Sequence, residues 1–237
     1  MMKADAIIVS AGKGQRFMTG RKKQFFSLGG KPILAHTLDP FDACPLIQSI
    51  FLVVGQEDQD YCLKEIIEKY KYRKISRVIP GGKQRQDSVK NGLDALPAHS
   101  EIVVIHDGVR PFVAKEMIED SIHSAIRFGA AIIAMPVKDT IKMAQADGTV
   151  LKTLDRESLY QAQTPQTFQT PLIREAYLRA FDDNFVGTDD ASLVERLGKK
   201  VHILPGSYTN IKITTLEDLM LAELILKMRA QTKGKEA

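Results

Sequence analysis

Short apolar runs alternate with segments of helical periodicity along most of the chain. The runs are rich in β-branched residues, which is typical of buried strands, and the helical patterns between them are those of βαβ units. We therefore expect an α/β fold with a doubly wound, mostly parallel, Rossmann-like sheet. Strands are expected at 6–10, 50–54, 75–79, 102–105, 130–135 and 201–204, and helices near 32–41, 59–70, 84–96, 115–128 and 191–197.

The pattern near the C-terminus predicts one more helix and its end. Thr215 would begin the final helix, with Asp218 as its capping-box partner. The polar residues 232–237 are expected to form a frayed tail. No internal repeat or linker interrupts the pattern, so we expect residues 1–231 to form one domain, which 237 residues are enough to fill.

One stretch breaks the alternation of strands and helices. Residues 141–144 and 149–154 read as strands and flank Asp147-Gly148, a strong hairpin signal. A hairpin inserted at this point cannot easily join a parallel sheet. We expect a protruding β-hairpin arm at about 137–159, which covers the site or projects to meet another subunit.

Composition and charge narrow the class of protein. The longest apolar runs, such as 130–137, are far short of the ~20 residues that cross a bilayer, and no signal peptide is visible, so we expect a cytoplasmic protein that contacts no membrane. Two cysteines are too few for a disulfide framework or a zinc site. The net charge is +4 without a basic block, which favours a pocket for a small polyanion over nucleic acid.

The loop after the first strand reads Ser10-Ala11-Gly12-Lys13-Gly14-Gln15-Arg16. Small residues leaving a strand let backbone N–H groups approach a phosphate, although a simple tight turn needs the same residues. Phe17 stands where a dinucleotide fingerprint needs its third glycine, and the loop does not end as a P-loop does. Arg16 and Lys22-Lys23 add cations at the carboxyl end of the strand, the usual ligand edge of such sheets.

Motifs along the chain resemble those of one family. Ala11-Gly12-x-Gly14-x-Arg16 with Lys23-Gln24 resembles nucleotidyltransferases that activate sugar and polyol phosphates. Together with the later motifs, the resemblance is to the 2-C-methyl-D-erythritol 4-phosphate cytidylyltransferases and runs from about Ile7 to Leu226. The later motifs are Gly81-Gly82 with Arg85-x-Asp87-Ser88-Val89, His106-Asp107-x-x-Arg110-Pro111, Asp139-Thr140, Asp155-Arg156, Thr164-Pro165-Gln166-x-Phe168, Thr188-Asp189-Asp190-Ala191-Ser192 and Asn210-Ile211-Lys212-Ile213-Thr214.

The resemblance implies a fold of the nucleotide-diphospho-sugar transferase type, CTP and a small polyol phosphate as substrates, Mg²⁺ or another divalent cation, and a homodimer formed through the arm. The acceptor phosphate would attack the α-phosphorus of CTP in line and release pyrophosphate. A phosphate monoester has its second pKa near ~6, so no general base is required. The reaction needs positioning and cations.

Lys23 and Arg16 are the candidates for stabilising transition-state charge. Ser10, Ala11, Gly12 and Gly14 would supply backbone contacts to CTP, while Lys13 would either contact phosphate or face solvent. Gly82 and Ser88 would read the cytosine edge, with a simple helix cap as the alternative for Ser88. The family often has an acid after the second glycine; Lys83 stands there, which puts a side-chain contact in doubt but not recognition by the backbone.

The remaining candidates concern the acceptor and the metal. Asp107 would help place Mg²⁺ or the CTP ribose and contact the acceptor, although the triphosphate oxygens would be the main ligands of Mg²⁺. His106 favours a structural role. Arg110 and Lys212 would hold the acceptor phosphate. Thr140 and Arg156 resemble residues that reach the acceptor of a neighbouring subunit, and Thr164 and Thr188 would add hydroxyl contacts or serve as caps or turns.

Two alternatives stay open. The same chemistry could act on ribitol 5-phosphate or another pentitol phosphate, although Asp155-Arg156 and the short Ala11-Gly12 loop favour the erythritol acceptor. A catalytically silent nucleotide-binding module could share this fold, since a fold does not prove a function. The presence of Arg16, Lys23 and Lys212 together argues against a silent module.

Overall fold

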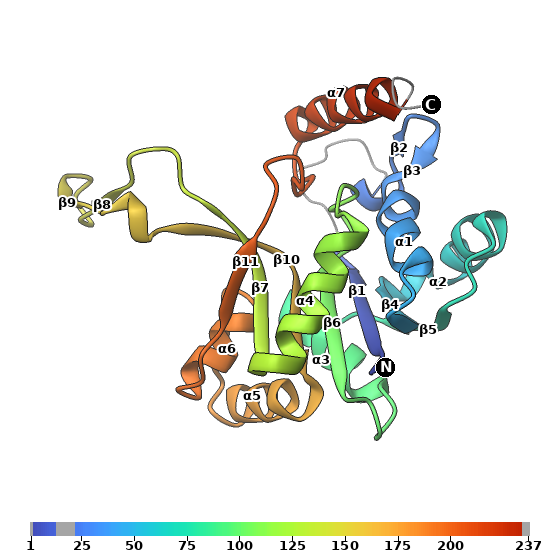
Figure 1. Cartoon of the computed structure of the whole chain (residues 1–237), viewed down its shortest axis with the longest axis horizontal. Coiled ribbons are helices and arrows are strands. Elements are labelled where there is room, and N and C mark those ends of the chain that lie inside the picture. The colour runs from blue at the N-terminus through green and yellow to red at the C-terminus, as the bar shows by residue number, and fades with distance from the viewer. Residues whose placement is uncertain (1, 13–21, 234–237) are drawn as a thin grey trace.

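The computed structural model describes residues 2–12 and 22–233. A seven-stranded sheet with the order β11-β7-β10-β6-β1-β4-β5 forms its centre (Figure 1). Only β10 runs antiparallel to its neighbours in the described sheet; the other pairings are parallel, as expected. The strands are β1 Ala4–Ser10, β4 Ile47–Val54, β5 Ile75–Pro80, β6 Ile102–Asp107, β7 Ala130–Pro136, β10 Tyr160–Gln169 and β11 His202–Pro205.

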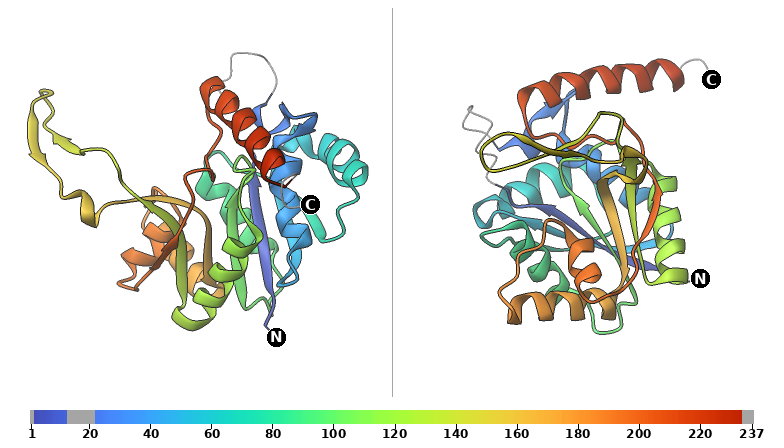
Figure 2. Two further views of the ribbon diagram at one scale, coloured as in Figure 1. Left: turned by 45° about the horizontal axis from the view of Figure 1, so that its top comes forward. Right: turned by 90° about the vertical axis from the view of Figure 1, so that its left-hand side faces the viewer.

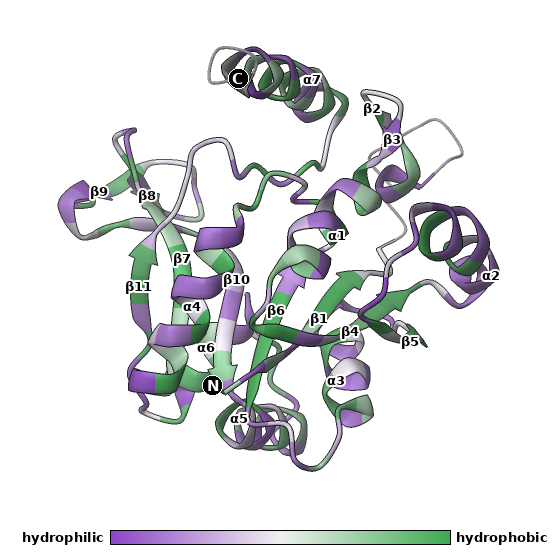
Figure 3. Cartoon of the chain, turned by 45° about the vertical axis from the view of Figure 1, so that its right-hand side comes forward, coloured by the Kyte–Doolittle hydropathy of each residue, from purple (hydrophilic) through white to green (hydrophobic). Residues whose placement is uncertain are grey.

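Helices cover both faces of the sheet, which confirms the doubly wound prediction. One core packs α1, α4 and a short π-helical segment against the sheet, and a second packs α3, α5 and α6 against the other face. Apolar residues concentrate on the strands between these layers (Figure 3). The helices are α1 Ile33–Ala43, α2 Gln59–Tyr61 with the π-helical Cys62–Glu68, α3 Arg85–Ala95, α4 Lys115–Phe128, α5 Thr170–Asp182, α6 Asp190–Arg196 and α7 Leu216–Lys233.

Three parts of the fold differ from the sequence prediction. The expected helix at 59–70 is split into one α-helical turn and a π-helical segment. Strand β10 and helix α5 were not predicted. In β10, Pro165 lacks an N–H for the ladder, and the pairing with β7 is irregular between Ala162 and Gln166, so the strand has no uniform pattern.

The predicted arm is present. Strands β8 (Lys142–Ala144) and β9 (Val150–Thr153) form a separate two-stranded sheet that projects away from the rest of the chain (Figure 2). The arm connects the adjacent strands β7 and β10. At its base the Val137 N–H donates to the Leu159 carbonyl over 2.9 Å. The arm is therefore a long excursion between two neighbouring strands and takes no part in the main sheet.

Helix α7 begins as predicted. The Asp218 N–H donates to the Thr215 hydroxyl, and the Asp218 carboxylate accepts from the Thr215 N–H over 2.9 Å. The helix runs to Lys233, so the first two residues of the expected frayed tail are helical, whereas 234–237 lie outside the described residues. Apolar residues of α7 join a third core with Leu28, Ile33 and Phe112. No helix in the described ranges is both long and apolar enough to span a membrane.

Candidate active site

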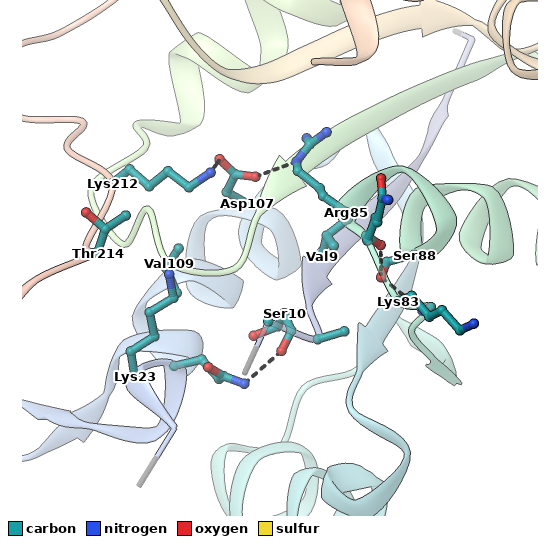
Figure 4. Close-up of a pocket in the computed structure, with 15 residues that line it drawn as sticks. Val9, Ser10, Lys23, Lys83, Arg85, Ser88, Asp107, Val109, Lys212 and Thr214 are labelled. Atoms are coloured by element: carbon teal, nitrogen blue, oxygen red, sulfur yellow. Dashed lines mark hydrogen bonds and ion pairs between the residues drawn. The ribbon is translucent and has the colours of Figure 1, made fainter. Parts of the chain in front are cut away.

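A cavity of about 850 Å³ opens at the carboxyl ends of β1, β5 and β6 (Figure 4). This is the edge at which ligands bind in open α/β sheets. Predicted CTP and acceptor residues from four separate segments of the chain meet there. The lining residues are Val9, Ser10, Ala11, Gly12, Lys23, Gln24, Gly82, Lys83, Gln84, Arg85, Ser88, Asp107, Val109, Lys212 and Thr214.

The first wall follows strand β1. Ser10, Ala11 and Gly12 line the cavity as predicted, and the Ser10 carbonyl accepts from the Gln24 side chain over 2.8 Å. This bond ties the strand end to the short 3₁₀ helix Lys23–Phe25, which carries Lys23 into the cavity lining. Lys13, Gly14 and Arg16 lie outside the described residues, so their predicted contacts remain predictions.

The second wall is the turn between β5 and α3. Gly81 packs so closely on the first loop that an added Cβ would lie 2.2 Å from the Cβ of Ala11. The Ser88 hydroxyl accepts from the Gly82 N–H over 3.1 Å and donates to the Gln84 carbonyl. Gln84 and Asp87 form the cap of α3, so the helix-cap alternative for Ser88 is wrong. Ser88 instead fixes the backbone of the turn.

The third wall is the end of β6, where Asp107 meets three cations. One carboxylate oxygen accepts from Arg85 Nε at 3.0 Å. The other lies 3.0 Å from Lys212 Nζ and 3.3 Å from Arg110 Nε. Burial alone would raise the pKa of Asp107, but these three cations together hold it well below the usual range. Asp107 is therefore a carboxylate throughout the physiological pH range.

The residues around Asp107 do not fit a metal site built from protein ligands. Mg²⁺ prefers several oxygen ligands in octahedral geometry. Asp107 is the one carboxylate among the described lining residues, and both of its oxygens already contact cations. The described residues also contain no cluster of three His, Cys, Asp or Glu suited to a metal. The role of Asp107 as a metal ligand stays a prediction that would require the loss of a cation contact.

Residues His106 and Thr164 support the end of β6 from behind. The Thr164 hydroxyl accepts from the Asp107 N–H over 3.1 Å and contacts His106 Nδ1 at 2.9 Å. His106 is fully buried, and burial lowers its pKa to about 3. These bonds agree with the structural role expected for His106. They also direct the Thr164 hydroxyl to Asp107, behind the cavity lining.

Four other predicted acceptor residues lie outside the cavity lining of the described chain. Arg110 is the nearest, because it contacts Asp107 and donates to the Asn210 carbonyl over 2.9 Å. This bond holds the loop that carries Lys212. Thr140 and Arg156 lie on the exposed arm, where Arg156 donates to the Lys138 carbonyl. Thr188 is exposed in the loop before α6.

Sequence reasoning missed Arg85 as a residue of the site, although it noted the motif around it. Arg85 is the first residue of α3, and its guanidinium reaches Asp107 on one side and Asp190 on the other. A cation is unfavourable at the N-terminal end of a helix, so an arginine at this position needs nearby acids. The two acids of Asp189-Asp190 were the available signal for such a partner.

Comparison with known proteins gives a consistent result. The family model described as 2-C-methyl-D-erythritol 4-phosphate cytidylyltransferase matches residues 4–228. A protein of this name from Syntrophus aciditrophicus is 49% identical over 225 residues, 95% of this chain and 96% of the relative. Another from Alkaliphilus oremlandii is 48% identical over 229 residues, 97% of each chain.

A solved structure of a 4-diphosphocytidyl-2C-methyl-D-erythritol synthase from Anaerococcus prevotii is also similar. It superposes with a TM-score of 0.85 at 37% identity and covers 95% of this chain and 99% of that one. The matched part of the sequence includes the whole described cavity. The chain belongs to the 2-C-methyl-D-erythritol 4-phosphate cytidylyltransferase family.

Proposed function

We propose that the cavity joins the CMP unit of CTP to 2-C-methyl-D-erythritol 4-phosphate and releases pyrophosphate. The observation that carries this proposal is the meeting of Lys23 and Lys212 at one cavity, in a chain that belongs to the family. These two lysines come from opposite ends of the sequence and would face two polyanionic substrates. The reaction product is the 4-diphosphocytidyl derivative, a precursor in non-mevalonate isoprenoid synthesis.

The chemistry requires charge and position and no general base. An oxygen of the acceptor phosphate forms a bond to the α-phosphorus, while the bond from that phosphorus to the β-bridging oxygen breaks and its electron pair leaves with pyrophosphate. With a second pKa near ~6, the acceptor phosphate is already mostly a dianion at neutral pH. The low pKa of His106 removes it as a proton donor. Lys23 would stabilise the charge that grows on the α-phosphoryl group.

Each wall would bind one part of the substrates. The first loop and Lys23 would hold the triphosphate, and the turn with Gly82 and Ser88 would present fixed backbone groups to the cytosine edge. Asp107 would order Lys212 and Arg110 for the acceptor phosphate. Mg²⁺ would enter as the Mg²⁺ complex of CTP and is therefore part of the substrate.

We also propose that the protein is a homodimer formed through the arm and that it acts in the cytoplasm. An isolated two-stranded sheet is only marginally stable in water, and β8 and β9 are exposed throughout. Exchange of arms about a two-fold axis would bury both arms and carry Thr140 and Arg156 to the cavity of the partner. The two free, buried cysteines are compatible with a reducing compartment.

Pyrophosphate release with Mg²⁺ and CTP, measured side by side with each acceptor, tests the proposal. We expect release with 2-C-methyl-D-erythritol 4-phosphate and at least about tenfold lower kcat/KM with ribitol 5-phosphate, roughly the lower limit of the discrimination that a pocket achieves for one methyl-sized group. A preference for ribitol 5-phosphate would show that the proposed acceptor is wrong and that the proposed transfer of CMP is right. If CTP binds and neither acceptor releases pyrophosphate, the chain is a nucleotide-binding module.

A further inference from the structure

A buried polar network connects the cavity to helices α5 and α6, which pack on the same face of the sheet as α3. Its centre is Asp190, which is fully buried at the start of α6. Two nitrogens of Arg85 donate to the two Asp190 oxygens over 3.0 and 2.8 Å. The Tyr177 hydroxyl donates to Asp190 over 2.6 Å. The third nitrogen of Arg85 donates to Asp107, so one guanidinium bridges the buried acid and the acid of the cavity.

The Asp190 end of this bridge is fixed to the sheet. The amide oxygen of Gln166 on β10 accepts from the Asp190 and Ala191 N–H groups, each over 3.1 Å. The amide nitrogen of Gln166 donates to Asp189 over 2.7 Å. Because β10 pairs directly with β6, Gln166 fixes the position of the start of α6 relative to the strand that ends at Asp107.

The Asp107 end of the bridge faces the reacting groups. The oxygen of Asp107 that accepts from Arg85 is distinct from the oxygen that contacts Lys212 and Arg110. Arg85 therefore fixes the rotation of the carboxylate, and the carboxylate in turn sets where the two cations lie. The side chain of Arg85 is 29% exposed, whereas that of Asp190 is 1% exposed and has no access to a substrate.

We propose that Asp190 is a positioning residue for nucleotidyl transfer, acting through Arg85 on Asp107 and thereby on Lys212. This inference rests on the proposed function, because its readout is the transfer step. Asp190 does not touch substrate. Removal of its charge should therefore have opposite effects on the binding of substrates and on the rate of transfer. Loss of one negative charge makes the cavity more cationic, which favours the binding of polyanions, whereas loss of position slows transfer.

The test is the isosteric substitution Asp190→Asn in the full chain. We expect kcat to fall by roughly tenfold or more, while the Kd for Mg²⁺–CTP stays equal or decreases. A lower kcat with an unchanged Kd separates a positioning role from a general loss of structure, because a general loss of structure would also weaken the binding of CTP. Unchanged kcat, or a parallel loss of kcat and CTP binding, would overturn the proposal.

Two further variants sharpen the test. In the Asp107→Asn background, Asp190→Asn should cost little additional kcat, because the two residues act in series; full additivity contradicts the proposal. If Asp190→Asn does not fold, Tyr177→Phe removes one donor to Asp190 and keeps the buried ring; it should lower kcat by roughly two- to fivefold, and unchanged kcat contradicts the proposal.

Arg174 provides the matched control. It lies on α5, like Tyr177, and its guanidinium donates to the Leu93 and Leu96 carbonyls near the far end of α3. Arg174→Met should lower the melting temperature and leave kcat unchanged, because the lost bonds lie far from the cavity lining. Wild-type protein and this control also separate the two hypotheses. If neither transfers CMP, the proposed function fails, whereas active controls with an unaffected Asp190→Asn variant reject only the positioning role.

Discussion

Two consecutive lysines occupy different environments. Lys22 contacts the carboxylates of Glu57 and Asp58, with Nζ 2.6 Å from Asp58. Burial opposes the charge of Lys22, but its bonds to these acids raise its pKa. Lys23, the next residue, lines the cavity. A count of cations in the sequence treats the two lysines as equal, whereas the structure places Lys22 in an ion pair and Lys23 in the cavity lining.

Substitution of Lys23 tests this difference. We expect Lys23→Ala to lower kcat by roughly 10²–10³-fold while CTP still binds, because the lost charge acts mainly in the transition state. Lys22→Ala is the matched control and should keep kcat within about twofold while it reduces stability modestly. Steady-state kinetics and calorimetric CTP binding on both purified variants measure these effects. Near-normal turnover of Lys23→Ala would remove Lys23 from the catalytic assignment.

His106 links the stability of the site to pH. Its folded-state pKa of about 3 lies below the ordinary value of 6.5, because burial disfavours the imidazolium. The unfolded chain therefore binds one more proton than the folded chain between these two values, and stability falls as pH decreases through this window. Asp107 adds a second window below its ordinary pKa of 3.8, because its folded-state pKa is also lowered.

The contribution of His106 can be measured by urea unfolding at pH 7 and pH 5. From the two pKa values we expect His106 to lower the free energy of unfolding of the wild-type protein by about 2 kcal/mol between pH 7 and pH 5. His106→Gln keeps a hydrogen-bonding side chain without a titrating ring. Its free energy of unfolding should therefore fall by about 2 kcal/mol less than that of the wild type between pH 7 and pH 5. Other titrating groups, such as His36, contribute equally to both proteins. Equal losses would show that His106 is not held neutral.

The turn from β5 into α3 is the element that we expect to select the base. Gly82 has no room for a side chain, since an added Cβ would lie 2.2 Å from the Cβ of Asp87. Its N–H is fixed by Ser88. Lys83, which replaces the acid common in the family, is exposed, and its side chain points away from Asp107 and Lys23 (Figure 4). We therefore expect the backbone of this turn, rather than the side chain of Lys83, to recognise the cytosine edge.

We expect the wild-type protein to prefer CTP over UTP, and the preference should depend on Gly82. Gly82→Ala must move the turn, so kcat/KM for CTP should fall about tenfold or more and the ratio of CTP to UTP should decrease. Lys83→Ala should leave the ratio nearly unchanged, because the exposed Lys83 side chain extends away from Asp107 and Lys23 and its removal leaves the backbone of the turn intact. Equal kcat/KM for CTP and UTP in the wild type would exclude base recognition by this turn.

The regular elements could be predicted from sequence, because periodicity follows burial. The strands β1, β4 and β6 are buried on both faces, and α4 was predicted with its observed ends, Lys115 and Phe128. Helix α5 was missed although its signal was present: Pro171 lies in its first turn, and Ile173, Ala176, Tyr177 and Ala180 form its buried stripe. Strand β10 was missed because its buried positions include Gln163, Thr164 and Gln166, whose polar side chains bond to two loops and to the end of strand β6.

The site could be predicted only where motif and cavity coincide. Lys23, Gly82, Ser88, Asp107 and Lys212 were assigned to the site and line the cavity. The role of Arg85 depends on a partner that lies 105 residues away in the sequence, and a single sequence gives no direct information on such a pairing. Any partner of the exposed arm would likewise be a property of an assembly, which the sequence of one chain does not describe.

In the whole molecule, the position of Arg156 on the arm suggests an active site that is built from two chains. Arg156 lies on the arm, which projects away from the rest of the chain (Figure 2) and contributes no residue to the described cavity lining. If arms are exchanged, Arg156 of one chain completes the cavity that contains Lys23 of the other. A dimer would then have two sites, each built from both chains.

Mixing inactive variants tests the shared site. Under subunit exchange, Lys23→Ala and Arg156→Ala proteins should recover activity, because a mixed dimer has one site with both lesions and one with neither. Lys23→Ala mixed with Lys212→Ala is the control and should stay inactive, because both residues line the same cavity and each site keeps a lesion. Failure to recover activity in the first mixture, with exchange proven by mass spectrometry, would rule out a shared site.

The base of the arm has a consequence for how such chains diverge. The bond between Val137 and Leu159 lies where the excursion leaves β7 and returns to β10, next to the paired residues Pro136 and Tyr160. Insertions or deletions beyond this bond leave the register of the central strands untouched. Natural variation can therefore change the reach of the arm while the nucleotide cavity and the core keep their geometry. If arms are exchanged, such variation would alter the acceptor contacts that a partner supplies and leave the binding of CTP unchanged.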